Sequence, residues 1–249
     1  MAAACIRKTV KAVHISSVIP GLVNDLSKRC PHVKFINVPV GCSGEVEKLQ
    51  EAKVILADPD TAPRHLSKLP ELEWLQLTWA GIDGVVERVT PQQKSSMMFT
   101  RFGGVFGPAM AQYVVGHIVS WEREFRKMWS DQQECKWDEE WRQIGKYRVM
   151  PKLTIGILGL GDIGQTIAKA CRALGMTVWG VGRRDKSDRQ DFVDHYTTLS
   201  RLPEVLQSCD YFVIYCQVHL PLNISYLEVH LRVVKTIALF LLTLVEGIL

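Results

Sequence analysis

The sequence predicts an α/β protein whose strands form doubly wound, mainly parallel sheets in two lobes. Three observations lead to this prediction: short apolar runs alternate with helix-like stretches, a later glycine-rich turn joins a strand to a helix, and the composition is globular. With 249 residues, of which 47% are hydrophobic and 22% charged, the chain is long enough to bury a core in one large or two small domains.

Four apolar runs in the first half have the length and the Val and Ile content of buried parallel strands. They are KAVHISSV, VKFINVPV, AKVILADP and LEWLQLTWAG, each bounded by Pro, Gly or Asp. The stretches GLVNDLSKRC and SGEVEKLQEA between them have helical spacing. This series predicts a first α/β domain, which we place at residues 1–104.

A stretch with helical periodicity follows the glycine-rich segment RFGGVFGPAM. Between Met110 and Met128, apolar or aromatic side chains recur every three or four residues: Tyr113, Val114, His117, Ile118, Trp121, Phe125 and Met128. The spacing predicts one long amphipathic helix with its apolar face buried. We interpret His117 in that face, and His14 in the first strand, as core residues rather than proton donors.

A second glycine-rich turn carries the clearest functional signal. A predicted strand, Thr154–Leu158, runs into Gly159-Leu160-Gly161-Asp162-Ile163-Gly164, then into a helix that stops at Gly175 and a second strand at Thr177–Val181. In a dinucleotide-binding turn the first glycine permits the tight bend, the second leaves room for the pyrophosphate, and the third lets the helix approach the strand. The start of the helix offers free N–H groups and a positive dipole to the phosphates.

The surrounding pattern predicts a Rossmann domain, which we place at residues 105–216. One face of the helix carries apolar side chains that can lie on a sheet: Ile163, Ile167, Ala170, Cys171 and Leu174. Glycines in a plain turn are the alternative. A methyltransferase also begins with such a turn, but its cofactor would need an acid at the end of the second strand, and the preceding α/β domain would be unexplained.

The residues after the second strand bear on which dinucleotide binds. Arg183 and Arg184 stand where an acid would hold the ribose 2′-hydroxyl of NAD. Arginine suits the 2′-phosphate of NADP through charge-assisted, bidentate hydrogen bonds. We therefore predict NADP(H) as the preferred cofactor and keep NAD(H) as the alternative, because Asp185 is the next residue.

Three ordered segments resemble the D-isomer-specific 2-hydroxyacid dehydrogenases, and most closely their glyoxylate/hydroxypyruvate reductase branch. They are LQLTWAGIDGV, FGPAMAQYVVGHI and GILGLGDIGQTIAKACRALGMTVWGVGRR, and the likeness runs from about Val10 to Tyr215. The resemblance implies a flavodoxin-like substrate domain and a Rossmann cofactor domain. It also implies reduction of a small 2-keto acid, such as glyoxylate or hydroxypyruvate, to a 2-hydroxy acid, usually by a homodimer. For Ala80 and Gly81 it implies backbone N–H groups that bind the substrate carboxylate, a role that a tight glycine turn can serve; a plain strand-to-helix turn is the alternative.

The sequence departs from this pattern after the predicted fourth strand, Tyr211–Tyr215. The family supplies an Arg, a His and a Glu for the reaction from the region that follows, as carboxylate clamp, proton donor and orienting carboxylate. We considered five residues there and found none in the family's context: His219, Glu228, His230, Arg232 and Glu246. We assign no catalytic residue.

We interpret residues 217–249 as a divergent hydrophobic tail of a truncated or alternatively spliced chain, or of an erroneous gene model. This predicts an incomplete Rossmann domain whose fourth strand is an open apolar edge. It also predicts weak or no reductase activity. The alternative function is a non-catalytic module that binds a dinucleotide or pairs with a full-length subunit through the helix at Met110–Met128.

Other partners and compartments are constrained by composition. A net charge of +4, without a run of five or more like charges, does not favour nucleic acid. The seven cysteines form neither a C-x-x-C pair nor a zinc-like cluster, so we expect no metal and reduced thiols in the cytoplasm. A mitochondrial presequence stays open, because no acid precedes Asp25. The apolar segment Val233–Leu249 is too short for a membrane span and is expected to form a buried or sticky helix.

Overall fold

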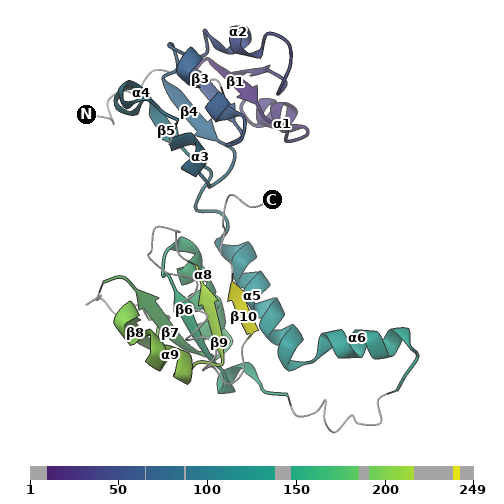
Figure 1. Cartoon of the computed structure of the whole chain (residues 1–249). Coiled ribbons are helices and arrows are strands. Elements are labelled where there is room, and N and C mark those ends of the chain that lie inside the picture. The colour runs from purple at the N-terminus through teal and green to yellow at the C-terminus, as the bar shows by residue number, and fades with distance from the viewer. Residues whose placement is uncertain are drawn as a thin grey trace. The chain divides into compact units, whose positions relative to one another are not determined.

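The computed structural model describes residues 10–64, 66–86, 88–137, 147–184, 191–215 and 238–241 (Figure 1). Contacts divide the chain into two compact units, Met1–Gly103 and Gly104–Leu249. Each unit is built on a five-stranded sheet in which every pairing is parallel. The predicted α/β class with two parallel sheets is confirmed.

The first unit contains the four predicted strands and a short fifth one. In chain order these are β1 (Ala12–Ser16), β2 (Lys34–Asn37), β3 (Val54–Ala57), β4 (Trp74–Leu77) and β5 (Met98–Thr100). Their spatial order, β2-β1-β3-β4-β5, is the flavodoxin-like order. Strand β5 was not predicted, because three residues are too few to show a period.

The helical elements of the first unit are short. They are α1 (Leu22–Arg29), α2 (Glu45–Leu49), η2 (Ala62–Arg64), η3 (Leu66–Lys68), α3 (Asp83–Val86) and α4 (Pro91–Ser96). The best-defined start is that of α4, where Thr90 Oγ1 accepts from the Gln93 N–H and Gln93 Oε1 accepts from the Thr90 N–H. This capping box satisfies two backbone donors at once.

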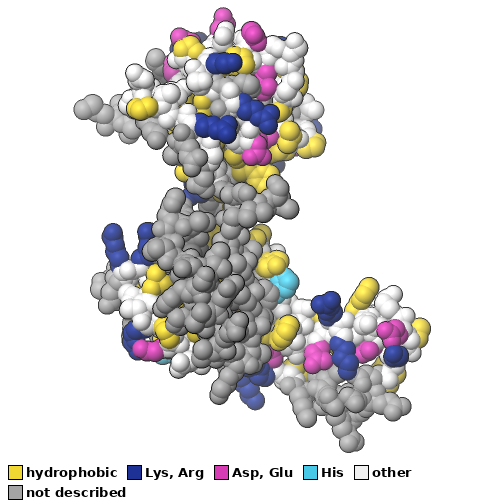
Figure 2. Space-filling model, viewed as in Figure 1, with side chains coloured by type: hydrophobic (Ala, Val, Ile, Leu, Met, Phe, Trp, Pro, Cys, Tyr) yellow, Lys and Arg dark blue, Asp and Glu magenta, His cyan; other side chains and the backbone are white. Residues whose placement is uncertain are grey.

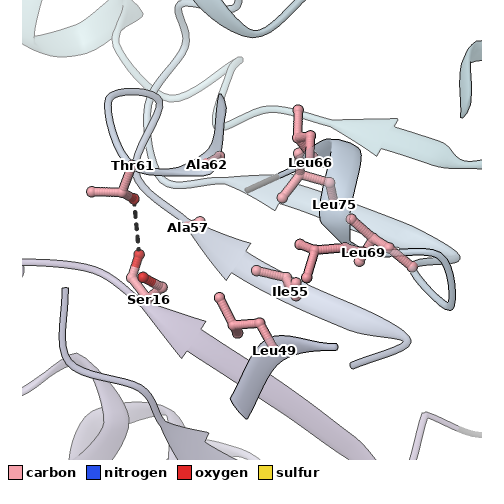
Figure 3. A pocket seen from close by; sticks show the side chains of 10 residues that line it. Ser16, Leu49, Ile55, Ala57, Thr61, Ala62, Leu66, Leu69 and Leu75 are labelled. Atoms are coloured by element: carbon pink, nitrogen blue, oxygen red, sulfur yellow. Dashed lines mark hydrogen bonds between the residues drawn. The ribbon is translucent and has the colours of Figure 1, made fainter. Parts of the chain in front are cut away.

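A small gap remains in the core of the first unit, between the sheet and the η2–η3 segment (Figure 3). Leucines make up half of its lining residues, and at one end Thr61 Oγ1 donates to the Ser16 carbonyl oxygen over 3.4 Å. The volume available to the centre of a water molecule is only about 10 Å³. Such a space holds roughly one water molecule and no organic ligand.

The second unit contains the strands that surround the glycine-rich turn. These are β6 (Thr154–Leu158), β7 (Thr177–Gly182), β8 (His195–Thr198), β9 (Tyr211–Ile214) and β10 (Ala238–Leu241). The order β10-β9-β6-β7-β8 places the earliest strand in the middle, as in a Rossmann sheet. Helix α8 (Asp162–Ala173) covers one face of this sheet, and η5 (Leu199–Arg201) with α9 (Leu202–Ser208) covers the other.

Strand β10 contradicts two expectations about the end of the chain. It pairs with β9 in parallel, from Ala238 opposite Tyr211 to Leu241 opposite Ile214, so the predicted open edge of the fourth strand is wrong. The predicted tail helix is also wrong at 238–241, and the rest of that segment lies outside the described residues. A short apolar run suits a strand and a buried helix equally well, and here the unpaired backbone of β9 offers it a hydrogen-bonding partner.

The predicted long helix is two helices, α5 (Gly107–Glu122) and α6 (Phe125–Gln133). They are separated at Glu124, whose φ of 51° lies in the left-handed region. The buried stripe of α5 consists of Gly107, Ala111, Val114 and Ile118 and packs on α8. A Cβ at Gly107 would lie 2.6 Å from Thr166 Oγ1, so the helices approach closely where one of them has no side chain.

Four large side chains that were predicted to lie on the buried face of this helix are therefore exposed. Their exposed fractions are 44% for Tyr113, 56% for Trp121, 48% for Phe125 and 45% for Met128. His117 is exposed as well and lies against Tyr113, with 4.2 Å between ring centroids, which corrects its assignment to the core. The buried stripe is offset from the aromatic one around the helix, and three- and four-residue spacing fits both.

A polar network fastens the end of α5 to the sheet, at the edge opposite the glycine-rich turn. Arg148 is paired with Glu122, at 2.5 Å between Nη2 and Oε1, and with Asp210. Tyr211 Oη donates to Glu122 Oε1 over 2.6 Å. Burial of the Glu122 carboxylate acts to raise its pKa, but the hydrogen bonds from Arg148 and Tyr211 hold the pKa below its ordinary value.

Candidate functional site

The glycine-rich turn at the end of β6 has the geometry that its sequence predicted. Gly159 adopts a φ of 96°, which favours glycine, and its N–H donates to the Val181 carbonyl of the neighbouring strand over 3.0 Å. A Cβ added to Gly164 would lie 2.0 Å from the Gly159 carbonyl oxygen. The third glycine is therefore required, because only a residue without a side chain lets α8 start this close to β6.

Gly161 stands just before the first turn of α8 and faces open space. It is the N-cap residue, no side chain caps the helix there, and a Cβ on it would meet no heavy atom within 4 Å. The first N–H groups of this twelve-residue helix thus lie beside a space that a side chain at position 161 would fill. This is the arrangement that a pyrophosphate needs, and the residues present fit a dinucleotide.

The other residues of the turn divide between the core and the surface. Leu160 and Ile163 are buried, and a Cβ on Gly180 of β7 would lie 2.4 Å from Leu160 Cδ1, so Leu160 packs directly over β7. Asp162 is exposed at the first position of α8. Helix α8 stops at Gly175, whose φ is 87°, as predicted. The prediction that Leu174 lies on the buried face is wrong, because Leu174 is exposed beyond the last turn.

Arg183 and Arg184 lie next to this turn. Both are exposed in the bend that directly follows β7. Leu158 of β6 is opposite Val181 of β7, so the glycine turn and the arginine bend leave the same edge of the sheet from adjacent strands. No carboxylate in the described ranges forms an ion pair with either arginine, and Asp185 is outside those ranges.

Ala80 and Gly81 lie at the corresponding edge of the first sheet, where β4 ends. Both are half-buried. Two hydrogen bonds hold the turn. Thr78, just before it, donates from Oγ1 to the buried Asp58 carboxylate over 2.5 Å. Arg101 donates from Nη1 to the Ala80 carbonyl over 2.9 Å.

Arg101 is a candidate that the sequence analysis missed. It is exposed and follows β5 directly, so it lies at the carboxyl edge of the sheet beside the Ala80–Gly81 turn. Its remaining N–H groups make no ion pair with any carboxylate that the structure describes. The available signal was its place after the short run MMFT, but β5 itself was not recognised.

Neither His14 nor His195 is placed for proton transfer at these edges. His14 lies inside β1 with a buried Nδ1 that has no hydrogen-bond partner, and burial, then Lys34, lowers its pKa. His195 begins β8 at the opposite edge and stacks on Trp179, with 4.5 Å between ring centroids. The five late residues that we considered for catalysis lie outside the described residues.

Neither a metal centre nor a membrane-spanning helix is found in the described part of the chain. No group of three or more His, Cys, Asp or Glu side chains gathers there in a way that could bind a metal ion. No described helix combines the length and the apolar character needed to cross a bilayer.

Comparison with known proteins agrees with this geometry. Residues 115–224 match the family described as "D-isomer specific 2-hydroxyacid dehydrogenase, NAD binding domain". A crystal structure of a D-isomer specific 2-hydroxyacid dehydrogenase family protein from Aeromonas salmonicida is 27% identical and superimposes with a TM-score of 0.70, over 84% of this chain and 64% of that one. Residues 115–224 therefore carry a domain similar to the NAD-binding domain of the D-isomer-specific 2-hydroxyacid dehydrogenases, and the described fold is similar to that of this family.

Among the proteins of this family, the chain is similar to the glyoxylate/hydroxypyruvate reductases. Glyoxylate/hydroxypyruvate reductase A of Escherichia fergusonii is 28% identical over 149 residues, which are 54% of this chain and 45% of that protein. The NADPH-dependent glyoxylate/hydroxypyruvate reductase of Sinorhizobium meliloti, solved with NADP and sulfate, shares the fold at 20% identity and a TM-score of 0.65, over 84% of this chain and 63% of that one. The chain spans about half or less of the length of the curated relatives that it matches, from 36% to 53%.

Proposed function

We propose that this chain binds NADP(H) at the carboxyl edge of the second sheet, as the cofactor for reduction of a small 2-keto acid. The observation that supports this most directly is the pair formed by Gly159 and Gly164, which brings the start of α8 against β6 and leaves Gly161 facing open space. The site residues of this proposal are the six of the glycine turn and the two arginines: Gly159, Leu160, Gly161, Asp162, Ile163, Gly164, Arg183 and Arg184.

The preference for NADP over NAD depends on Arg183 and Arg184. Solved family members of the same fold hold either cofactor: the Sinorhizobium meliloti reductase was solved with NADP, and an Aquifex aeolicus D-lactate dehydrogenase with NAD. The fold therefore does not decide between them. Two exposed guanidinium groups beside the glycine turn favour a 2′-phosphate, because a charge-assisted contact is about twice as strong as a neutral one.

Titration with reduced dinucleotide tests this proposal. The purified chain is titrated with NADPH and with NADH, and binding is followed by nicotinamide fluorescence. We expect NADPH to bind at least about tenfold more tightly, because each lost charge-assisted hydrogen bond weakens binding substantially. Replacing both arginines by alanine should abolish the difference, and Gly161→Asp should prevent binding of both. Equal affinity for NADH and NADPH in the unmodified chain would contradict the NADP preference.

The substrate side of the proposal rests on the first unit. Backbone N–H groups at Ala80 and Gly81 and the guanidinium of Arg101 together offer an anion site suited to the carboxylate of a 2-keto acid. Glyoxylate and hydroxypyruvate are the named candidates, because they are what the similar curated proteins are named for. In this proposal Arg101 supplies the cation for the substrate carboxylate, a role for which no residue was predicted from the sequence.

Turnover by this chain alone is expected to be slow or absent. Reduction also needs a proton donor and a carboxylate that orients it, and loss of a general acid costs about 10²–10⁴-fold in rate. No Arg, Glu or His after Tyr215 stands in the context that the family resemblance implies. Consumption of NADPH with glyoxylate or hydroxypyruvate by the purified chain, absent in Gly161→Asp, would overturn this part of the proposal. The compartment is predicted to be the cytoplasm, with the mitochondrion as the alternative.

A second candidate function, subunit pairing, is favoured by the exposed aromatic surface of α5 and α6. We call this surface the aromatic face; it consists of Tyr113, Trp121, Phe125, Met128 and Trp129. In Figure 2 hydrophobic side chains are visible over these helices among charged ones. Several large exposed apolar side chains on two consecutive helices indicate an interaction site more strongly than one isolated side chain does. The partner proposed for it is a second copy of this chain or a full-length subunit of the same family.

A further inference from the structure

We infer that Tyr196 is a positioning residue of the cofactor site, which sets the preference for a 2′-phosphorylated dinucleotide by fixing the bend that carries Arg183 and Arg184. This inference rests on the proposed function and deepens it. Tyr196 is the second residue of β8 and has no expected contact with the cofactor of its own. Its role follows from where its ring and its hydroxyl lie.

The ring of Tyr196 lies along the backbone of β7. Tyr196 is opposite Gly180 in the register of the two strands. A Cβ on Gly180 would lie 3.1 Å from Tyr196 Cδ2, and a Cβ on Gly182 would lie 2.0 Å from Tyr196 Oη. The side chain thus extends from the middle of β7 to its carboxyl end, over two residues that have no side chain.

The hydroxyl of Tyr196 reaches the arginine bend at the end of this path. Tyr196 Oη donates to the Arg184 carbonyl over 2.9 Å. Arg183 and Arg184 are exposed, and β7 ends at Gly182, so the ladder of the sheet no longer holds them. This hydrogen bond therefore restrains the backbone at the point from which both guanidinium groups project.

The two glycines of β7 are needed for space rather than for backbone conformation. Neither Gly180 nor Gly182 has a positive φ, so another residue could adopt the same backbone there. The strip of bare backbone that they create is shared: Leu160 of the glycine turn packs on Gly180, and Tyr196 lies over Gly180 and Gly182. The strip links the turn expected to bind the pyrophosphate to the bend expected to bind the 2′-phosphate.

The chemistry of the restraint makes it selective. A guanidinium that must meet a phosphate in bidentate geometry loses affinity when its backbone is free to move, because ordering it then costs conformational entropy. A dinucleotide without the 2′-phosphate does not use that geometry. Loss of the Tyr196 hydroxyl should therefore weaken NADPH binding and leave NADH binding nearly unchanged.

The test is Tyr196→Phe, which removes the hydroxyl and keeps the ring. NADPH and NADH are titrated against the unmodified chain and the variant by nicotinamide fluorescence. We expect the Kd for NADPH to rise about three- to tenfold, as for one net hydrogen bond, and the Kd for NADH to change less than about twofold.

Tyr211→Phe is the matched control, because it removes a hydroxyl from the same sheet at the opposite edge. There Oη donates to Glu122 rather than to the cofactor edge. This variant should have a lower melting temperature but an unchanged ratio of the two dissociation constants. A purely structural role for Tyr196 would give it the behaviour of Tyr211.

A double-mutant cycle gives a second, independent measurement. Gly182→Ala must displace the Tyr196 hydroxyl, so it should also lower the preference for NADPH. Combined with Tyr196→Phe it should cost little more than either change alone, because both act through one hydrogen bond. Additive losses would overturn the inference.

The outcomes separate the inference from the proposed function. If the unmodified chain binds neither dinucleotide, the proposed function fails and the inference fails with it. If the chain prefers NADPH and Tyr196→Phe retains the same preference, the proposed function stands and the role of Tyr196 is refuted.

Discussion

The Cα of Gly164 lies so close to the Gly159 carbonyl oxygen that a Cβ would come within 2.0 Å of that oxygen. The obstacle is backbone, which cannot rotate aside as a flexible side chain can. The start of α8 is therefore held against the end of β6 by packing within the chain itself. The neighbouring Gly161 has no such constraint, since a Cβ there would meet nothing within 4 Å.

Gly164→Ala should therefore destabilise the second unit strongly. Alanine is the better helix former by about 1 kcal/mol, but the clash with the Gly159 carbonyl should outweigh this gain and cost about 3 kcal/mol or more. Urea denaturation followed by circular dichroism measures the loss. A variant as stable as the unmodified chain would show that the close approach at Gly159 is not present in solution.

Gly161→Ala is the matched control for this prediction. Its φ of −79° suits any residue, and its surroundings are open, so the free energy of unfolding should change by about 1 kcal/mol or less. The added methyl group fills the space next to the helix start, so binding of NADPH should weaken while the fold persists. The two variants separate the packing role of one glycine from the binding role of the other.

Local pattern was sufficient to predict the elements that build the site. The turn from Gly159 to Gly164 follows directly from its glycine spacing between a strand and a helix, and the four strands of the first half follow from their apolar runs. These predictions concern segments in which neighbouring residues decide the conformation. The arginine bend after Gly182 was found in the same way, from its distance to the glycines.

Tertiary context decided what the pattern could not. Tyr113, His117 and Trp121 share the helical spacing of a buried face, but α8 packs on the adjacent stripe through Ala111 and Val114, so spacing alone chose the wrong one. Strand β10 formed because β9 had a free edge, which no local signal in its own residues could reveal. Arg101 and Tyr196 acquire meaning only from strands that are neighbours in space.

Glu122 makes the stability of the second unit depend on pH. Its carboxylate, 9% exposed, accepts hydrogen bonds from Arg148 and Tyr211, and its folded pKa is lowered. A lowered folded pKa means that the unfolded chain binds more protons, so this contribution is present above the ordinary glutamate pKa and is lost as the pH falls through the folded value. Glu122→Gln should cost about 2–3 kcal/mol at neutral pH, because it breaks a largely buried ion pair.

The measurement is urea denaturation of the unmodified chain and of Glu122→Gln at about pH 7 and about pH 4. An ordinary glutamate is ionised at the first pH and partly protonated at the second. The difference in free energy of unfolding should shrink at the lower pH. Glu204→Gln is the control, since the side chains of its pair with Arg201 are 55–60% exposed and water screens the pair, so this substitution should change the free energy of unfolding little at either pH. An equal difference at both pH values would exclude Glu122 as the titrating group.

Leu66 tests how tightly the first unit is packed around its small gap. Its side chain is 1% exposed and lines the space between η3 and the sheet (Figure 3). Leu66→Ala enlarges that space and should cost about 3–5 kcal/mol. Leu174→Ala removes the same atoms from a side chain that is 44% exposed and should cost much less. Similar losses in thermal unfolding for the two variants would contradict the packing described for η3.

Arg101 should be needed for binding of a carboxylate but not for folding. Oxalate, a small dicarboxylate, is the probe. The fluorescence of Trp79, which is exposed beside Ala80, reports binding, and the signal of Trp79→Phe gives the contribution of the other tryptophans to be subtracted. Arg101→Gln should weaken oxalate binding at least about tenfold, because it removes a charge-assisted contact. Arg88→Gln, an exposed arginine of the same unit, should bind like the unmodified chain. Unchanged binding by Arg101→Gln would remove Arg101 from the substrate site.

The aromatic face on α5 and α6 should support self-association. Trp121 and Trp129 are 56% and 64% exposed, and burying such side chains in a partner would contribute about 1.5–3 kcal/mol each. Sedimentation velocity at micromolar concentration should show a dimer, and Trp121→Asp with Trp129→Asp should convert it to a monomer without changing the melting temperature of the isolated fold. Trp137→Asp is the control, because Trp137 is 90% exposed outside both helices. A monomer before any substitution would mean that a second copy does not cover this face, and loss of the dimer in Trp137→Asp alone would place the interface elsewhere.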